Sequence, residues 1–159
     1  MKKIIIVLLF LVLVPSISAQ ELEKINLPAQ VVNPGDFYYS AIRLWEKITE
    51  RFQFNNDAKF RYSSSLIDKR VSELIFVIKD KRLDEVQRSS ERLAYQVGVL
   101  TEFLIKQKSS QEKEQLRAKI NGFLPALSEL RDAYPANSSY WMLVQHDINS
   151  FKEYSEKLK

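Results

Sequence analysis

The sequence predicts an all-α protein, a mostly antiparallel bundle of five helices that follows an N-terminal signal peptide. Three observations indicate this fold class. Five segments repeat apolar residues every three or four positions, which is the spacing of one face of an α-helix. Glycine is sparse, with three residues in a chain of 159, whereas good helix formers are abundant. No segment shows a convincing strand pattern of alternating apolar and polar residues.

The N-terminus has the plan of a secretory signal peptide. Lys2 and Lys3 precede an unbroken apolar run at residues 4–14, and small residues follow up to Ala19. The run is shorter than the roughly 20 residues that a membrane-spanning helix needs. We therefore expect cleavage between Ala19 and Gln20 and export to the periplasm or the cell exterior. An uncleaved N-terminal membrane anchor is the alternative.

Composition narrows the classes of function. Loss of the signal removes two of the 24 basic residues and none of the 20 acidic ones, so the exported chain is nearly neutral. That balance gives no reason to expect a nucleic-acid partner. The chain has no cysteine and is long enough to fold around one core without disulfides. The predicted organisation is a signal peptide at 1–19, an extended tail at 20–33 and a single helical domain at 34–159.

The first predicted helix covers residues 37–52, with Asp36 as its N-cap. Its apolar residues fall within one broad arc, which we expect to pack into the core against the second helix. The arc contains Phe37, Tyr38, Ala41, Ile42, Leu44, Trp45, Ile48 and Phe52. Tyr39, Arg43 and Glu46 lie outside the arc and are expected on the polar side.

The second predicted helix covers residues 56–79 and is capped by Asn55 or Asn56. Its apolar stripe consists of Phe60, Ile67, Val71, Leu74 and Ile78. The run at residues 74–78 is apolar on every side, so we expect that end of the helix to be deeply buried.

The third predicted helix, residues 82–107, has the most regular heptad pattern of the chain. The heptad residues are Leu83, Val86, Ser90, Leu93, Val97, Leu100 and Leu104. Tyr95, Val99 and Phe103 form a second stripe on the opposite side. Either the following helices cover this stripe, which we favour, or it is exposed as a groove for a partner.

Two further helices are predicted at residues 111–133 and 138–157, separated by the loop sequence YPANSS. The fourth helix presents Leu116, Ile120, Phe123, Leu127 and Leu130, and the fifth presents Trp141, Val144, Ile148, Phe151, Tyr154 and Leu158. Because the connections are short, successive helices should run antiparallel.

The segment PGDFYYSAIRLWEKITERFQFNN resembles the opening of a family of exported bacterial proteins that is known only as a domain of unknown function. The matching elements are a Pro-led turn, a tyrosine, a Trp-Glu pair in an apolar-basic helix, an aromatic-x-aromatic break and a lysine. They correspond to Pro34, Tyr39, Arg43, Trp45, Glu46, Phe52, Phe54 and Lys59. The resemblance covers roughly residues 33–105. It departs from the pattern at Asn55-Asn56, where Asp-Pro is common, and at Phe37, where a proline is common. It implies an exported helical domain and no reaction, cofactor or catalytic residue.

No catalytic, cofactor or metal site is predicted. His146 is the single histidine, and a zinc site needs three or four ligands that converge on one point. The chain lacks a Gly-x-Ser-x-Gly elbow, and its few glycines leave little backbone for an oxyanion hole. These features argue against an enzyme.

We therefore expect a non-enzymatic interaction or scaffold domain that binds a protein partner at the cell envelope. The candidate partner-binding residues are Tyr39, Arg43, Tyr95 and Phe103. The alternative is an envelope-surface binder that uses a basic end of the bundle on anionic lipid or wall polymer. That end would gather Lys59, Arg61, Lys106, Lys108, Lys113, Lys157 and Lys159. The sequence does not define an oligomeric state.

Overall fold

The computed structural model describes residue 25 and residues 27–159. Within these residues the chain forms five α-helices and no strand, so the all-α prediction is confirmed. The helices are α2 (Tyr39–Arg51), α3 (Asn56–Lys79), α4 (Leu83–Gln107), α5 (Ser110–Asp132) and α6 (Ser139–Lys157). Each begins and ends within two residues of its predicted bounds. The predicted signal peptide at residues 1–19 lies outside the described residues.

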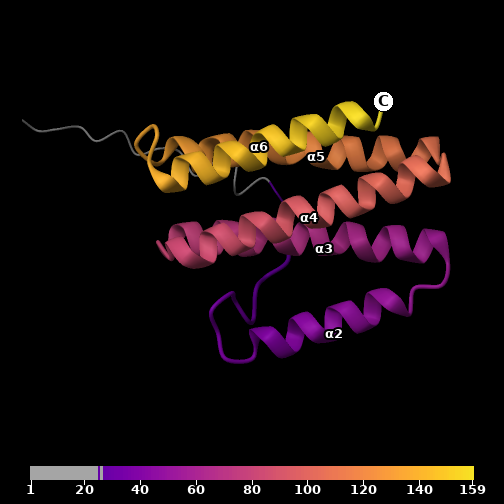
Figure 1. The fold of residues 1–159 in the computed structure, drawn as a ribbon, viewed down its shortest axis with the longest axis horizontal. Coiled ribbons are helices and arrows are strands. Elements are labelled where there is room, and N and C mark those ends of the chain that lie inside the picture. The colour runs from indigo at the N-terminus through magenta and orange to yellow at the C-terminus, as the bar shows by residue number, and fades with distance from the viewer. Residues whose placement is uncertain (1–24, 26) are drawn as a thin grey trace, which may run out of the picture.

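The helices are arranged in three layers (Figure 1). α5 and α6 form one layer, α3 and α4 form the next, and α4 also packs along α6. α2 lies on the outer side of the α3 and α4 layer. The hydrophobic core is shared by α3, α4, α5 and α6, and no buried residue of α2 belongs to it.

The apolar stripes predicted for these four helices are in the core. All five stripe residues of α3 and all five of α5 are buried, as are the heptad residues of α4 except Leu83. In α6, Val144, Ile148 and Phe151 are fully enclosed, Leu158 is buried just beyond the helix, and Tyr154 packs against the core at its edge. Trp141, which was predicted in the same stripe, is half-buried and lies outside the core. Regular apolar spacing therefore predicted correctly which side of each of these helices faces inward.

Helix starts follow from local capping chemistry. The Asn55 and Ser138 side chains each accept a backbone N–H in the first turn of the helix that follows. Asp36 was predicted to cap the first helix, and this prediction is wrong. Its carboxylate instead accepts the backbone N–H of Asn33 at 2.8 Å, which closes a turn three residues before α2 begins at Tyr39.

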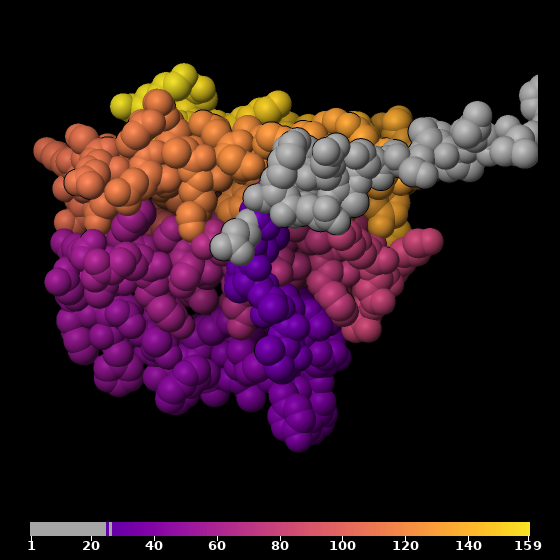
Figure 2. Space-filling model, turned by 180° about the vertical axis from the view of Figure 1, so that it is seen from behind, coloured from indigo at the N-terminus to yellow at the C-terminus, as the bar shows by residue number. Residues whose placement is uncertain are grey.

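The segment that precedes α2 lies on the surface of the bundle. Ile25 and Leu27 pack against the core, and the Ser72 hydroxyl of α3 donates a hydrogen bond of 3.1 Å to the carbonyl of Pro28. Figure 2 shows this segment, in indigo, passing across the bundle towards α2. The start of α2 is thus fixed to α3 by the chain that leads into it.

The orientation of α2 is the reverse of the predicted one. Phe37 is 92% exposed and Trp45 is 68% exposed, although both were expected in the core. Tyr39 and Glu46, which were expected on the polar side, are buried. The reason is that α3 offers α2 a polar surface that contains two buried charged side chains, Arg70 and Glu73, and only the polar side of α2 can satisfy them.

Candidate interaction surfaces

The inner side of α2 is held to α3 by a buried polar network. The Tyr39 hydroxyl donates a hydrogen bond of 2.8 Å to Glu73 Oε2. Arg70 donates to both Glu46 and Glu73, which places one guanidinium between two carboxylates. Lys69 adds a contact of 2.5 Å to the other oxygen of Glu46. Because every charge in this network has an opposite neighbour, the polar interface can be buried.

The protonation states of two groups follow from these contacts. Burial acts to raise the pKa of the Glu46 carboxyl, but the hydrogen bond from Lys69 and the charges of Arg70 and Lys69 outweigh it and lower the pKa. Burial and the neighbouring Glu73 carboxylate raise the pKa of the Tyr39 hydroxyl. Glu46 is therefore an anion and Tyr39 a neutral donor at neutral pH.

The outer side of α2 is a continuous apolar surface. We call it the outward face of α2, and it consists of Phe37, Tyr38, Leu44, Trp45, Ile48 and Phe52, each at least 40% exposed. Phe37 packs edge-on against Tyr38, and Phe52 packs edge-on against Phe54 just beyond the helix. Large apolar side chains are seldom exposed together on a soluble protein without a partner.

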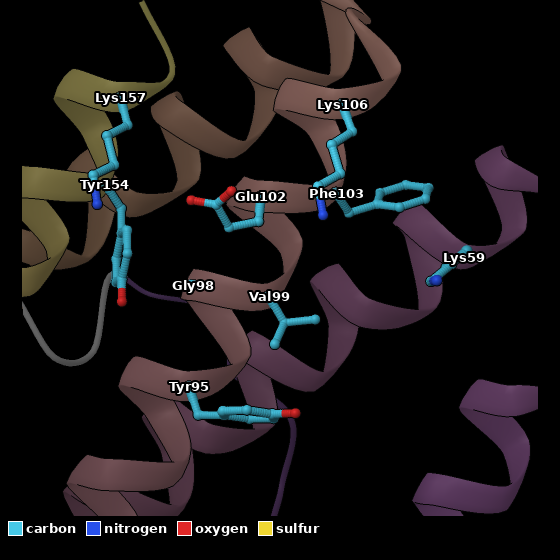
Figure 3. A pocket seen from close by; sticks show the side chains of 9 residues that line it. All are labelled: Lys59, Tyr95, Gly98, Val99, Glu102, Phe103, Lys106, Tyr154 and Lys157. Carbon is cyan, nitrogen blue, oxygen red and sulfur yellow. The ribbon is translucent and has the colours of Figure 1, made fainter.

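A second surface lies along α4 (Figure 3). Here an open groove of about 560 Å³ runs between the start of α3 and the end of α6. We call it the α4 groove, and it is lined by Lys59, Tyr95, Gly98, Val99, Glu102, Phe103, Lys106, Tyr154 and Lys157. Tyr95, Val99 and Phe103 occupy successive turns of α4 and form its apolar floor.

Gly98 shapes one wall of the α4 groove. A Cβ at this position would lie 2.8 Å from the Tyr154 hydroxyl, closer than any side chain tolerates. Glycine therefore lets the Tyr154 ring of α6 lie directly against α4. Figure 3 shows Tyr154 on one side of the groove and Phe103 on the other.

Lysines surround the apolar floor. Lys59 lies 4.7 Å from the centre of the Phe103 ring, and Lys157 lies 5.4 Å from that of Tyr154. Among the described residues, neither Lys59 nor Lys106 forms an ion pair, whereas Lys157 pairs with Glu153 at 2.8 Å. A neighbouring hollow of about 320 Å³ extends the groove towards the cations at the end of α2. The groove thus combines aromatic surface with net positive charge.

The four predicted partner-binding residues do not form one site. Tyr39 is buried in the network beneath α2, and Arg43 is half-buried beside it, 2.8 Å from Glu46. Tyr95, which is 70% exposed, and Phe103, which is half-buried, both line the α4 groove. The favoured interpretation that this stripe is core is wrong for Tyr95 and Val99, because α5 and α6 pack on the other side of α4.

Sequence reasoning missed the outward face of α2 because it treated apolar residues as evidence of burial. A signal for the correct orientation was present in α3. Arg70 and Glu73 stand one helical turn apart, beside the core residues Val71 and Leu74. Charged residues so close to a core stripe require polar partners from a neighbouring helix.

The basic end that supported the alternative function is partly neutralised. Three of its cations form ion pairs with carboxylates three or four residues before them: Arg61 with Asp57, Lys157 with Glu153, and Lys159, just beyond α6, with Glu156. These pairs are exposed, so each contributes little to stability. Each nevertheless places a carboxylate beside the cation, which reduces the positive charge of this end of the bundle.

Asp147 is a buried acid outside both surfaces. It lies on α6, beside the exposed His146, and accepts a hydrogen bond of 2.8 Å from the Ser90 hydroxyl of α4. Burial raises the pKa of the Asp147 carboxyl to about 7, while the Ser90 hydrogen bond acts in the opposite direction. Its second oxygen has no hydrogen-bond partner, which is consistent with a protonated carboxyl.

Residue 25 and residues 27–159 contain no group of three or more His, Cys, Asp or Glu side chains that could hold a metal ion. None of the helices in this part of the chain has the length and hydropathy needed to cross a membrane.

Comparison with known proteins gave no match to a family model, a curated protein or a solved structure. The resemblance to the exported family therefore stays a prediction.

Proposed function

We propose that the chain is a non-enzymatic, exported interaction domain that binds a protein partner at the cell envelope through the α4 groove. The observation that carries the proposal is the apolar floor of the groove, in which Tyr95 and Val99 are exposed and Phe103 is half-buried. This floor is placed between lysines from three helices. A concave strip of this kind, one helix wide, suits an amphipathic segment laid lengthwise along it.

Charge defines the chemistry of the partner segment. Lys59 and Lys106 reach the groove without a carboxylate partner among the described residues, and Glu102 is the single acid that lines it. A complementary segment presents apolar side chains to the floor and carboxylates to the flanking lysines. The aromatic contacts supply most of the affinity, because Tyr and Phe lose little conformational entropy on binding.

The test compares the wild-type chain with a matched pair of variants. Residues 20–159 are immobilised, detergent-solubilised envelope extract of the native host is passed over them, and the column is washed with rising salt. We expect one defined protein to be retained at high salt by the wild type and by Met142→Ala, an exposed control on α6. The double variant Tyr95→Ala and Val99→Asp should lose it, because the apolar floor of the groove is removed.

Tyr95 is largely exposed and Val99 is 38% exposed, so the double variant should stay folded and lose only about 1–2 kcal/mol of unfolding free energy. Circular dichroism and thermal unfolding check this. Retention of the same protein by the groove variant would contradict the proposal. Recovery of lipid or wall polymer alone, lost at moderate salt, would contradict the protein-partner proposal and favour an envelope-surface binder.

A further inference from the structure

We propose that the outward face of α2 docks the domain on the surface of an anionic lipid bilayer, with the helix axis in the plane of the interface. The proposal concerns a different face from the α4 groove and does not depend on the protein partner. Three features of α2 carry it: its charge distribution, its aromatic content and its place at the edge of the molecule.

The charges of α2 are sorted between its two sides. Both acidic residues of the helix are directed towards the bundle. Glu46 is paired with Arg70 and Lys69, and Glu50 accepts hydrogen bonds from α3 and α4. Lys47 and Arg51 are exposed, and no carboxylate of α2 is exposed beside them. The solvent side of the helix is therefore apolar and cationic, the combination that binds anionic membranes.

The aromatic content also fits a lipid interface. Four of the six residues of the outward face are aromatic, namely Phe37, Tyr38, Trp45 and Phe52. Tryptophan and tyrosine prefer the headgroup region, where the ring is in apolar surroundings and its polar atom stays hydrated. Leu44 and Ile48 lie between them and would enter the acyl boundary.

The charge of the face argues for lipid over a second copy of the chain. Lys47 and Arg51 are exposed on the solvent side of α2, so a second copy would bring two equally cationic faces together. Anionic headgroups instead complement both cations. A bilayer also needs no complementary shape, so separate aromatic side chains can enter it.

The position of α2 leaves this face accessible. The helix is the outermost layer of the molecule, and its inner side is fixed by the buried network (Figure 1). Docking therefore needs no unfolding of the bundle. The network keeps the polar side of α2 on the protein while its outward face meets the lipid.

Trp45 gives a direct spectroscopic test. The chain has two tryptophans, so Trp141→Phe makes Trp45 the single reporter. Residues 20–159, which include every described residue, are mixed with vesicles of phosphatidylglycerol and phosphatidylcholine, or of phosphatidylcholine alone. We expect the Trp45 emission to shift to shorter wavelength with the anionic vesicles, and the affinity to be at least about tenfold higher than for the neutral ones.

Matched variants locate the contact. Leu44→Glu should reduce binding at least about tenfold, whereas Met142→Glu, equally exposed on α6, should leave it unchanged. Replacing Lys47 and Arg51 by glutamine should weaken binding to the anionic vesicles roughly 30-fold, since each cation near such a surface adds about fivefold. The single groove variant Tyr95→Ala, which adds no charge beside Lys47 and Arg51, should bind vesicles normally, which separates this proposal from the protein-partner proposal.

Three results would overturn the inference. One is an unchanged Trp45 emission with anionic vesicles. The second is wild-type vesicle binding by Leu44→Glu. The third is a dimer in light scattering without lipid that Leu44→Glu dissociates, because the outward face would then join two copies of the chain.

Discussion

Two buried carboxyl groups have pKa values shifted in opposite directions. Glu46 is surrounded by cations, and its pKa is lowered although burial acts to raise it. Asp147 has one hydroxyl as its partner, and burial raises its pKa to about 7. The same type of group is thus kept ionised in one place and holds a proton below about pH 7 in the other, according to the neighbours that the fold supplies.

The raised pKa of Asp147 predicts a pH-dependent stability. An aspartate in the unfolded chain has a pKa of about 3.9. Between that value and about 7, the folded chain keeps a proton that the unfolded chain has released. This contribution to stability is complete at the acid end of the range and is lost as the pH rises towards 7.

Asp147→Asn should remove this dependence while its side chain can still accept the Ser90 hydrogen bond. The gain in unfolding free energy over the wild type should be larger at pH 8 than at pH 5 by roughly 3 kcal/mol, because pH 5 lies about two units below the folded pKa and one pKa unit corresponds to about 1.4 kcal/mol. Urea denaturation at the two pH values measures it. His146→Gln, the exposed neighbour, is the control. Equal pH dependence of wild type and Asp147→Asn would refute the assignment.

At the scale of the elements, α2 is attached through its polar side. Arg70→Met should leave Glu46 and Glu73 buried without their shared cation, and we expect a loss of about 3–5 kcal/mol of unfolding free energy. Replacing four groups together, as Arg70→Met, Glu46→Leu, Glu73→Met and Tyr39→Phe, should recover most of it, because neither an unpaired charge nor a hydroxyl without its acceptor then remains buried. Urea denaturation of the wild type and the variants tests both statements.

Lys119→Met is the matched control for an ion pair of lower burial. Its pair with Asp68 has a separation of 2.7 Å, but both side chains are more than a quarter exposed. Its loss should therefore cost less than about 1 kcal/mol. An Arg70→Met cost as small as that of Lys119→Met would show that the network does not hold α2 in place.

α2 packs through its polar side and the other four helices through their apolar stripes, and this difference explains which orientations the sequence could predict. In α3, α4, α5 and α6 the apolar stripe faces a core that the helices share, so spacing alone identified the inner side. In α2 the pattern is equally clear, but it only separates an apolar side from a polar side and does not determine which of them is buried. The orientation of α2 is determined by Arg70 and Glu73 of α3, which are far away in the sequence.

The candidate surfaces were predictable to different extents. Tyr95 and Phe103 were identified as a stripe opposite the α4 heptad, and they line the α4 groove. The part that α6 plays in the groove was not predictable. Tyr154 of α6 can approach α4 only because Gly98 has no side chain. Close packing of this kind is a property of two helices together and not of either pattern alone.

For the molecule as a whole, the division between α2 and the shared core predicts two levels of stability. α2 contributes no buried residue to the hydrophobic core, so it can open while the other helices stay folded. In native-state hydrogen exchange, amides of α2 should exchange with an opening free energy well below that of global unfolding. Amides near Val71, Leu100 and Leu127, in the centre of the core, should require global unfolding.

The Arg70→Met variant sharpens this measurement. It should lower the opening free energy of α2 more than that of α3 to α6, because the lost contacts lie at the α2 interface. Uniform exchange, with α2 amides as protected as those at Leu100, would mean that the domain opens only as one cooperative unit.

The sequence separation of the α2 contacts has a consequence for the growing chain. Synthesis proceeds from the N-terminus, so α2 is the first of the described helices to be made. Tyr39 accepts a hydrogen bond from Arg92, which is added 53 residues later. At typical rates of about 5–20 residues per second, this interval lasts roughly 3–10 s. During that time α2 has no complete docking site, so the first helix to be synthesised has to wait until α4 is being made before it can take its place.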